Sequence, residues 1–258
     1  MSLELLDKTR MINRLLNEQA SEKIDFTDFC RELSRTLEVN VVLVSRKGKV
    51  LGLKERQEIS VIPQLADVKY GDYLEPTLQE RFMNILSTKE NVNLLTLGFS
   101  FENVEEYEAM ISPISMAGIR LGTLFVYRQQ PSFSIDDIIL TEYGTTVIGL
   151  AMQRAESEEI SEEQHKEHDV MAAVKTLSKL EIKAVLEVLN ELDGRKEGIL
   201  VTSRLADRVG ITRSVIVNAL KKCESAGIIQ TRSSGMKGTT VCIVNDLFSY
   251  ELIAKSLA

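Results

Sequence analysis

Residues 202–240 read TSRLADRVGITRSVIVNALKKCESAGIIQTRSSGMKGTT, and this stretch decides the fold of the C-terminal part of the chain. Its first segment places Leu205 and Val209 at helical spacing, and Gly210 favours an end to that helix in the left-handed conformation. Thr212 follows where a second helix would begin, and its hydroxyl is expected to accept from free backbone N–H groups of the first turn. Two helices joined by a glycine turn are therefore predicted.

The second predicted helix has one apolar face and is followed by a hairpin. The residues expected to face inward are Val215, Ile216, Ala219, Leu220 and Cys223. Ala226-Gly227 ends this helix, and predicted strands at 228–231 and 239–244 flank a glycine-containing tip. Two strands joined by such a loop are typical of a hairpin. Helix, turn, helix and hairpin together predict a winged helix-turn-helix.

The net charge of this stretch is opposite in sign to that of the whole chain. Residues 201–240 hold seven Lys and Arg against two acids, a net charge of +5, whereas the chain carries −7. Such a reversal is the electrostatic footprint of a phosphate-binding segment, and a helix-turn-helix presents the start of its second helix to base edges in the major groove. A helical hairpin with solvated charges is the alternative, and the turn glycine, caps and hairpin favour DNA binding over it. The predicted DNA-binding residues are Ser203, Arg204, Thr212, Arg213, Ser214, Val217, Asn218, Lys221, Lys222, Arg232, Ser234 and Lys237.

The composition predicts a globular chain of about two domains, since it has 258 residues, 44% of them hydrophobic and 27% charged. No apolar run is long enough to cross a membrane, and the N-terminus mixes acids into its apolar residues, so neither a transmembrane helix nor a signal peptide is expected. Its three cysteines lack metal-ligand spacing. They are typical of thiols in a reducing cytosol, so a cytoplasmic protein without a bound metal is predicted.

The N-terminal part alternates helices and strands in a pattern that predicts an α+β domain with a largely antiparallel sheet. Helices are expected at 3–16, 26–37 and 78–86. Strands are expected at 40–45, 50–53, 93–101, 107–116 and 119–127. The hairpin within 112–124 looks like the central hairpin of GAF domains, which are small-molecule sensors.

A long helix follows this domain. Ser134 and Asp137 form a predicted capping box, and residues 155–169 carry seven acids against one lysine. Such a run is a solvated connector and a natural domain boundary. We therefore expect a GAF-like effector-binding domain at 1–155, an acidic helical connector at 156–178, and a winged helix-turn-helix at 179–258.

The turn between the strands at 40–45 and 50–53 is a candidate anion site. It reads Ser45-Arg46-Lys47-Gly48-Lys49, so three cations share one tight turn. Cations and backbone N–H groups of such a turn can neutralise a polyphosphate. An ordinary exposed hairpin tip would have the same composition, and the residues alone favour neither interpretation.

Signatures of catalysis are missing from the sequence. It contains no glycine-rich phosphate loop, no Rossmann fingerprint, no His-Glu-x-x-His motif and no nucleophile elbow. The chain is therefore predicted to be a ligand-responsive transcription factor rather than an enzyme. Two alternatives stay open, namely a GTP-hydrolysing regulatory enzyme and a DNA-binding protein whose GAF domain only dimerises.

Residues 206–239 closely resemble the DNA-binding domain of the CodY family, and the resemblance extends more loosely to 8–10, 44–49, 120–124 and 140–149. It implies a dimeric global repressor of double-stranded, AT-rich operators of nutrient-response and virulence genes. The implied effectors are GTP and the branched-chain amino acids isoleucine and valine. The implied GTP-binding residues are Phe26, Ser45, Arg46, Lys47 and Lys49.

The amino-acid pocket of the family is matched less well. Its members have an arginine in the helix after the first hairpin, and the window 59–66 has none. Arg56 is the candidate carboxylate partner here. The expected apolar wall consists of Leu74, Leu78, Phe99 and Phe101, for each of which core packing is the alternative role.

Overall fold

The computed structural model describes residues 3–18, 24–233 and 238–256, and the chain divides into two compact units, residues 1–157 and 158–258. Helix α4 (Ile135–Lys175) contributes residues to both units. Each unit encloses hydrophobic clusters of its own, apart from those of the other unit.

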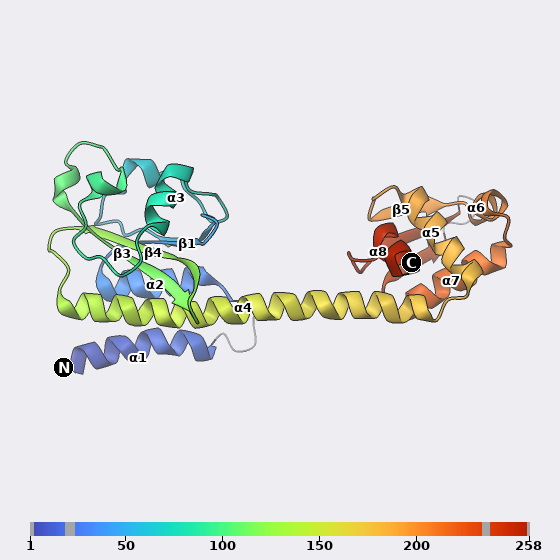
Figure 1. The fold of residues 1–258 in the computed structure, drawn as a ribbon, viewed down its shortest axis with the longest axis horizontal. Coiled ribbons are helices and arrows are strands. Elements are labelled where there is room, and N and C mark those ends of the chain that lie inside the picture. The colour runs from blue at the N-terminus through green and yellow to red at the C-terminus, as the bar shows by residue number, and fades with distance from the viewer. Residues whose placement is uncertain (1–2, 19–23, 234–237, 257–258) are drawn as a thin grey trace. The chain divides into compact units, whose positions relative to one another are not determined.

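Unit 1 has the α+β architecture that the sequence predicts (Figure 1). Its strands β1 (Asn40–Ser45), β2 (Val50–Lys54), β3 (Tyr107–Met116) and β4 (Ile119–Gln129) form an antiparallel sheet in the order β2-β1-β4-β3. Its helices are α1 (Leu3–Glu18), α2 (Phe26–Leu37), α3 (Pro76–Met83), the first part of α4, and the 3₁₀ turns η1 (Pro63–Leu65), η2 (Leu94–Leu97) and η3 (Val104–Glu106).

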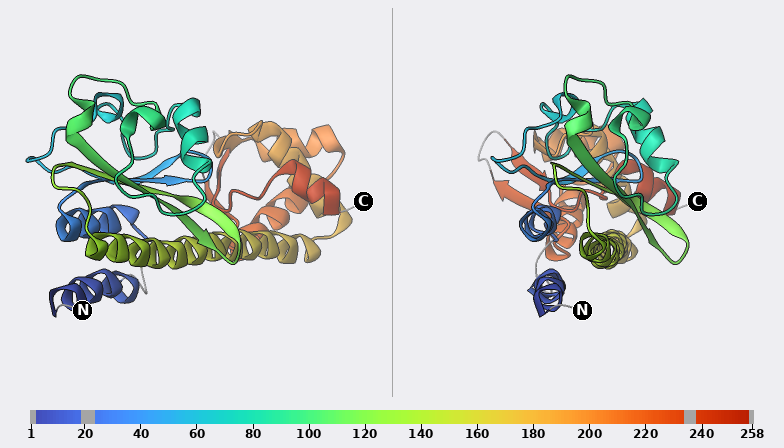
Figure 2. Two further views of the ribbon diagram at one scale, coloured as in Figure 1. Left: turned by 60° about the vertical axis from the view of Figure 1, so that its left-hand side comes forward. Right: turned by 90° about the vertical axis from the view of Figure 1, so that its left-hand side faces the viewer.

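The two faces of this sheet bury two separate apolar clusters. In β1, Val41 and Leu43 belong to one cluster and Val42 and Val44 to the other. Successive side chains of a strand point to opposite faces, which is why one continuous apolar strand serves both. Helices α1, α2 and α4 cover the first face, and α3 with the loops around η1 and η2 covers the second (Figure 1 and Figure 2).

The predicted strand at 93–101 is wrong. Asn93 accepts from the Leu95 N–H at 2.9 Å and Gly98 adopts a left-handed φ of 90°, so the segment closes into η2. Leu94 and Leu97 are both buried, at the i, i+3 spacing of a 3₁₀ turn. The backbone of Lys89, not this segment, bridges to Ile111 of β3.

Helix α3 begins and ends earlier than the predicted 78–86. The carboxylate of Glu75 accepts from the N–H groups of Thr77 and Leu78 and so starts the helix at Pro76. Proline suits the first position of a helix because its missing N–H has no intrahelical partner there. The helix ends at Met83.

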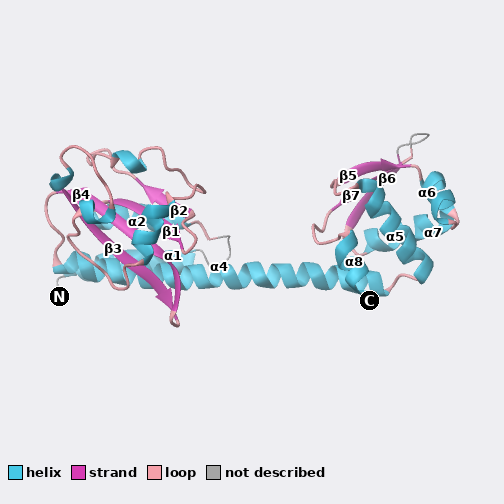
Figure 3. Cartoon of the chain, turned by 45° about the horizontal axis from the view of Figure 1, so that its top comes forward, coloured by secondary structure: helices cyan, strands magenta, loops and turns pink. Residues whose placement is uncertain are grey.

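Unit 2 contains the predicted helix-turn-helix and hairpin together with one unpredicted strand. Its elements after α4 are α5 (Lys179–Leu192), β5 (Glu197–Leu200), α6 (Thr202–Val209), α7 (Arg213–Ser225), β6 (Ile229–Ser233), β7 (Thr239–Ile243) and α8 (Tyr250–Ser256). The strands form an antiparallel sheet in the order β5-β7-β6 beside the helices (Figure 3). The short β5 carries no strand pattern of its own and becomes a strand through its pairing with β7.

The acidic run is an exposed part of α4. Residues 156–169 are all solvent-exposed and helical. After α4 ends, Ser178 and Glu181 form the capping box of α5, in which Ser178 Oγ accepts from the Glu181 N–H at 3.3 Å and Glu181 Oε2 accepts from the Ser178 N–H at 2.7 Å. Nowhere in the described ranges is a helix both long and apolar enough to span a bilayer.

Candidate DNA-binding surface and effector sites

The turn between α6 and α7 is closed by one glycine. Gly210 has a φ of 68°, and its N–H donates to the carbonyl of Ala206 at the end of α6. Thr212 occupies the cap position of α7, but its hydroxyl lies 2.8 Å from Ser214 Oγ and makes no cap bond to the backbone. The expected role of the Thr212 hydroxyl is therefore corrected, because the neighbouring Ser214 hydroxyl provides its partner.

Helix α7 has a buried face and an exposed face. Ile216, Ala219, Leu220 and Cys223 are buried, as the sequence predicts for four of its five inward positions, while Val215 is only half-buried. The opposite face carries Arg213, Ser214, Val217, Asn218 and Lys221, all exposed except the half-buried Val217. These positions recur at the i, i+3 and i+4 spacing that aligns side chains along a helix. They form a continuous polar strip that begins at the helix N-terminus.

Arg213 is positioned by the preceding helix. Its Nε donates to Oγ1 of the buried Thr202, at 3.2 Å, so α6 orients the guanidinium. Nε is only one of the donors of the guanidinium fork, and the terminal nitrogens remain available to bind bidentately. Ser203 and Arg204, the next two residues of α6, are exposed.

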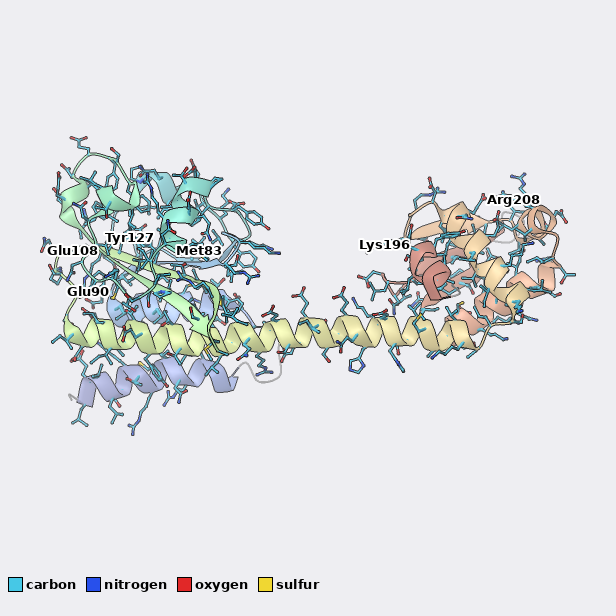
Figure 4. The ribbon with its side chains drawn as sticks, in the orientation of Figure 1. Met83, Glu90, Glu108, Tyr127, Lys196 and Arg208 are labelled. Atoms are coloured by element: carbon cyan, nitrogen blue, oxygen red, sulfur yellow. The ribbon has the colours of Figure 1, made fainter. Side chains whose placement is uncertain are left out.

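Two cations of the predicted DNA-binding segment are held within the unit. Arg208 Nη1 lies 2.9 Å from Glu187 and 2.8 Å from Glu191 of α5, and Figure 4 shows its place on α6. Lys222 Nζ lies 2.8 Å from Glu181 Oε2 and donates to the carbonyl of Thr176 at 3.1 Å. The hydrogen bond from Lys222, and next that from the Ser178 N–H, lower the pKa of Glu181. Lys222 therefore links α7 to α5. Lys221, its neighbour on the polar strip, pairs with no acid among the described residues.

The wing, which is the hairpin of β6 and β7, follows α7 in the chain. Arg232 of β6 is exposed and lies opposite Thr240 of β7. Glu224 accepts from the N–H and the hydroxyl of Thr231, at 2.7 and 2.9 Å, and so joins the end of α7 to the first wing strand. Ser234 and Lys237 lie outside the described residues. Among the described residues, Arg204, Lys221 and Arg232 form no ion pair.

In unit 1, the cationic turn is a rigid hairpin tip. Ser45 Oγ accepts from the Lys49 N–H at 3.0 Å, and the Ser45 carbonyl accepts from the Gly48 N–H at 2.9 Å. Arg46, Lys47 and Lys49 are exposed, and within the described part of the chain they form no ion pair. Three unpaired cations thus share one turn whose backbone is fixed.

The turn is tied to helix α3. The Leu74 N–H donates to the Gly48 carbonyl at 2.9 Å, and Gln79 Nε2 of α3 donates to the Arg46 carbonyl at 3.0 Å. Phe26, the other residue predicted for this site, is half-buried at the start of α2, where it packs on the first sheet face and its ring centroid is 6.1 Å from that of Phe29. A displacement of the turn would therefore change its hydrogen bond to Gln79 and so displace α3.

The structure brings together the apolar residues predicted for the amino-acid site. Leu74, Leu78 and Phe99 are buried in the cluster on the second sheet face, where the Phe99 ring stacks on Phe125 with centroids 5.6 Å apart. Phe101 is half-buried at the edge of that cluster and meets Tyr107 edge-on, with centroids 5.2 Å apart. Figure 4 marks Tyr127, whose burial in the same cluster raises its pKa to about 12.

Arg56, the predicted carboxylate partner, lies apart from these apolar residues and contacts Ser34 and Glu58. Its Nη1 donates to the carbonyl of Ser34 in α2 at 3.5 Å, and its Nε lies 3.4 Å from Glu58. Helix α2 packs on the first sheet face, whereas Phe99 belongs to the second. Arg56 and the apolar wall are therefore not brought together in this structure.

Unit 1 also contains a pocket of about 500 Å³ that no sequence motif predicts. Its charged lining includes Arg81 at the end of α3 and Lys89 beside β3. Neither residue stands in a motif, and 81–97 folds back so that its two ends meet only in three dimensions.

Comparisons with known proteins agree with both units. Residues 4–176 match the CodY GAF-like domain, and residues 196–255 match the CodY helix-turn-helix domain. The chain is 42% identical over 255 residues to the global transcriptional regulator CodY of Geobacillus kaustophilus (strain HTA426), covering 97% of this chain and 98% of that protein.

A second full-length relative gives the same assignment. The global transcriptional regulator CodY of Clostridium botulinum (strain Okra / Type B1) is 43% identical over 261 residues, covering 96% of this chain and 97% of that protein. A solved cofactor-binding GAF domain of the nutrient sensor CodY from Clostridium difficile is 30% identical, with a TM-score of 0.42, covering 58% of this chain and 98% of that one. Both domain matches and the full-length relatives show that this chain belongs to the CodY family of global transcriptional regulators.

Proposed function

We propose that this chain is a repressor that binds AT-rich operators through α7 and the wing and that responds to branched-chain amino acids and GTP. The observation that carries the DNA part is the polar strip of α7. The strip starts with Arg213, whose guanidinium can donate two hydrogen bonds to guanine, and includes Asn218, whose amide can pair with adenine. Lys221 extends the same strip, is exposed and forms no ion pair with a described residue, so we expect it to contact a DNA phosphate.

Two arms of one experiment test this placement. Arg213→Ala should weaken specific operator binding by about 1–3 kcal/mol and relax specificity at the contacted base pair. The matched control is Arg14→Ala on α1, which is exposed in unit 1 and removes the same charge. Binding is measured by titration of the full chain against a matched and a substituted operator. Equal affinity of Arg213→Ala and Arg14→Ala for the operator would contradict the role of α7.

The turn at 45–49 supports a nucleotide polyphosphate as one effector. Three cations with no ion pair among the described residues offer a local positive potential, and a fixed backbone lowers the cost of ordering the site. Lys47→Ala/Lys49→Ala should abolish the response of operator binding to GTP while preserving the response to isoleucine and the basal DNA affinity. A full GTP response in this variant would exclude the turn as the nucleotide site.

A homodimer is supported by apolar side chains that unit 1 leaves exposed. They lie on α1 and on the part of α4 in the same unit, and they are Leu3, Met11, Ile135, Ile139 and Leu150. Helix-turn-helix proteins place two reading heads about one DNA turn apart, which requires two copies. Analytical ultracentrifugation of Ile139→Glu should show a shift toward monomer, and an unchanged dimer would place the interface elsewhere.

A further inference from the structure

The described residues include three exposed aromatic side chains, Tyr70, Tyr73 and Tyr250. Two of them, Tyr70 and Tyr73, lie in one loop of unit 1, where their exposed fractions are 69% and 65%. Within the described ranges, neither ring contacts another aromatic ring and neither hydroxyl forms a hydrogen bond. A tyrosine that serves the core usually packs its ring and bonds its hydroxyl. These two rings therefore add little to the core of unit 1.

The loop that carries the two rings is fixed to the cationic turn by its backbone. Val50 donates to the Asp72 carbonyl at 2.8 Å and accepts from the Gly71 N–H at 2.9 Å. Lys49 and Tyr73 consequently face each other as an antiparallel bridge. Side chains directly opposite in such a bridge project from the same side, with Cβ atoms about 4.5–5.5 Å apart. Tyr73 and Lys49 thus present a ring and an ammonium group together.

The same loop adds a fourth cation to the three of the turn at 45–49. Lys69 precedes Tyr70 and is exposed, like the cations of the turn. Among the described residues, none of the four forms an ion pair. The carboxylate of Asp72 accepts from the Lys69 N–H at 2.9 Å, and that of Glu75 accepts from the N–H groups that begin α3. These two acids bind backbone donors and leave the cationic groups to solvent.

Exposed rings beside unpaired cations are the composition of a surface for single-stranded nucleic acid. Every base has a flat face that can stack on an aromatic ring, and the phosphates between successive bases are bound by cations. A double helix keeps its base faces stacked inside the duplex, so it cannot use the rings. The hydrogen-bonded backbone of the turn and the loop lowers the cost of ordering such a surface.

We propose that the surface formed by Lys69, Tyr70, Tyr73 and the turn at 45–49 binds a single strand of RNA or DNA, with bases stacked on the two rings. This activity goes beyond the proposed operator binding, which uses α7 and the wing. It shares the cationic turn with the proposed GTP site, so GTP should compete with a bound strand. RNA and DNA strands offer the same stacking and phosphate chemistry, and the 2′-hydroxyl distinguishes them.

The experiment is fluorescence anisotropy of the full chain with labelled strands of about 12 nucleotides, one of oligo(U) RNA and one of oligo(dT) DNA. Tyr70→Ala and Tyr73→Ala should each weaken binding about 5- to 150-fold, the loss expected for one stacked base. Tyr70→Phe and Tyr73→Phe keep the ring and should bind as the unmodified chain does. Tyr250→Ala removes the third exposed ring, which lies in unit 2, and is the matched control.

A second measurement tests the cations. Each phosphate contact of a single strand contributes about 0.7 to the slope of log affinity against log salt, so Lys47→Ala/Lys49→Ala should reduce that slope by about 1.4. The tyrosine variants should keep the slope, because stacking releases no counterion. Circular dichroism confirms that each variant is folded. Binding of either strand with these dependences supports the proposal, and the tighter strand identifies the preferred sugar.

The contrary outcomes separate this surface from the proposed operator and GTP sites. Strand binding that survives Tyr70→Ala and Tyr73→Ala but falls in Arg213→Ala would place the strand on α7 and overturn the proposal. Absence of strand binding to the unmodified chain, with operator binding and the GTP response intact, would overturn it and leave the proposed function in place. Strand binding that depends on the rings, in a chain without a GTP response, would support the surface and refute the GTP site at the turn.

Discussion

Lys221 and Lys222 are adjacent on α7, and the structure predicts different consequences for the removal of each. Lys221 is exposed and pairs with no acid among the described residues. The Lys222 ammonium lies 2.8 Å from Glu181 and 3.1 Å from the carbonyl of Thr176. Lys221→Ala should therefore affect DNA binding alone, and Lys222→Ala should chiefly affect the stability of unit 2.

The expected magnitudes follow from these contacts. One lost phosphate contact reduces the slope of log affinity against log salt by about 0.9, and the loss is the same for every DNA sequence. Lys222 has a side chain that is 43% exposed, so solvent screens its ion pair, which we expect to contribute about 0.2–1 kcal/mol. Its bond to the Thr176 carbonyl adds about 0.5–1.5 kcal/mol. The two contributions sum to about 0.7–2.5 kcal/mol, and each 1 kcal/mol lost lowers the Tm of a unit of this size by about 4–8 °C.

Two assays on the same pair of variants check this reasoning. Operator affinity is measured for the full chain at four salt concentrations, and thermal unfolding is followed by circular dichroism. Lys221→Ala should change the salt slope and keep the Tm, and Lys222→Ala should lower the Tm and keep the slope. A reduced slope for Lys222→Ala at unchanged Tm would refute its assignment as a tether.

Three further predictions come from single contacts, and a fourth comes from the exposed arginine of the wing. Ser178→Ala should cost about 1 kcal/mol of unfolding free energy in chemical denaturation, because the α5 cap is lost. The lowered pKa of Glu181 stabilises the fold above the unfolded pKa of about 4.3 and less as pH falls through the folded value, so Glu181→Gln should flatten that part of the acid-unfolding curve. Gln79→Leu removes the bond from α3 to the cationic turn, and titration should show weaker cooperativity between GTP and isoleucine. Arg232→Ala should lose more operator affinity on A-tract flanks than on G·C flanks, and equal losses would remove the wing from the readout.

Local sequence determined the elements of this protein where a pattern and a cap agree. The continuous apolar β1, the i, i+4 pattern of α7, the turn at Gly210 and the capping box at Ser178 all depend on residues within a few positions of one another. Short-range sterics and hydrogen bonds decide such features, so they can be predicted without knowledge of the fold. The α+β sensor and the winged helix-turn-helix followed from them.

Tertiary structure decided the features that depend on residues far apart in the chain. The segment at 93–101 has the composition of a strand, yet the edge of β3 is occupied by the stretch at Lys89, and the segment closes into η2. β5 becomes a strand only because β7 offers its hydrogen-bonding edge. Propensity over four to nine residues is a weak preference, and the availability of a partner strand overrides it.

The charges of the chain divide in the same way: their number follows from the sequence, and their partners follow from the tertiary structure. The sequence determined that residues 201–240 are strongly basic, and this conclusion needs only a count of side chains. The partner of each cation depends on distant elements, since Lys222 meets Glu181, 41 positions away, while Arg81 meets the bare backbone of Gly98. A charge that has a partner at 2.8 Å stabilises the fold, and a charge without a partner is available to a ligand. Because that distinction is a matter of distance in space, only the folded chain could make it.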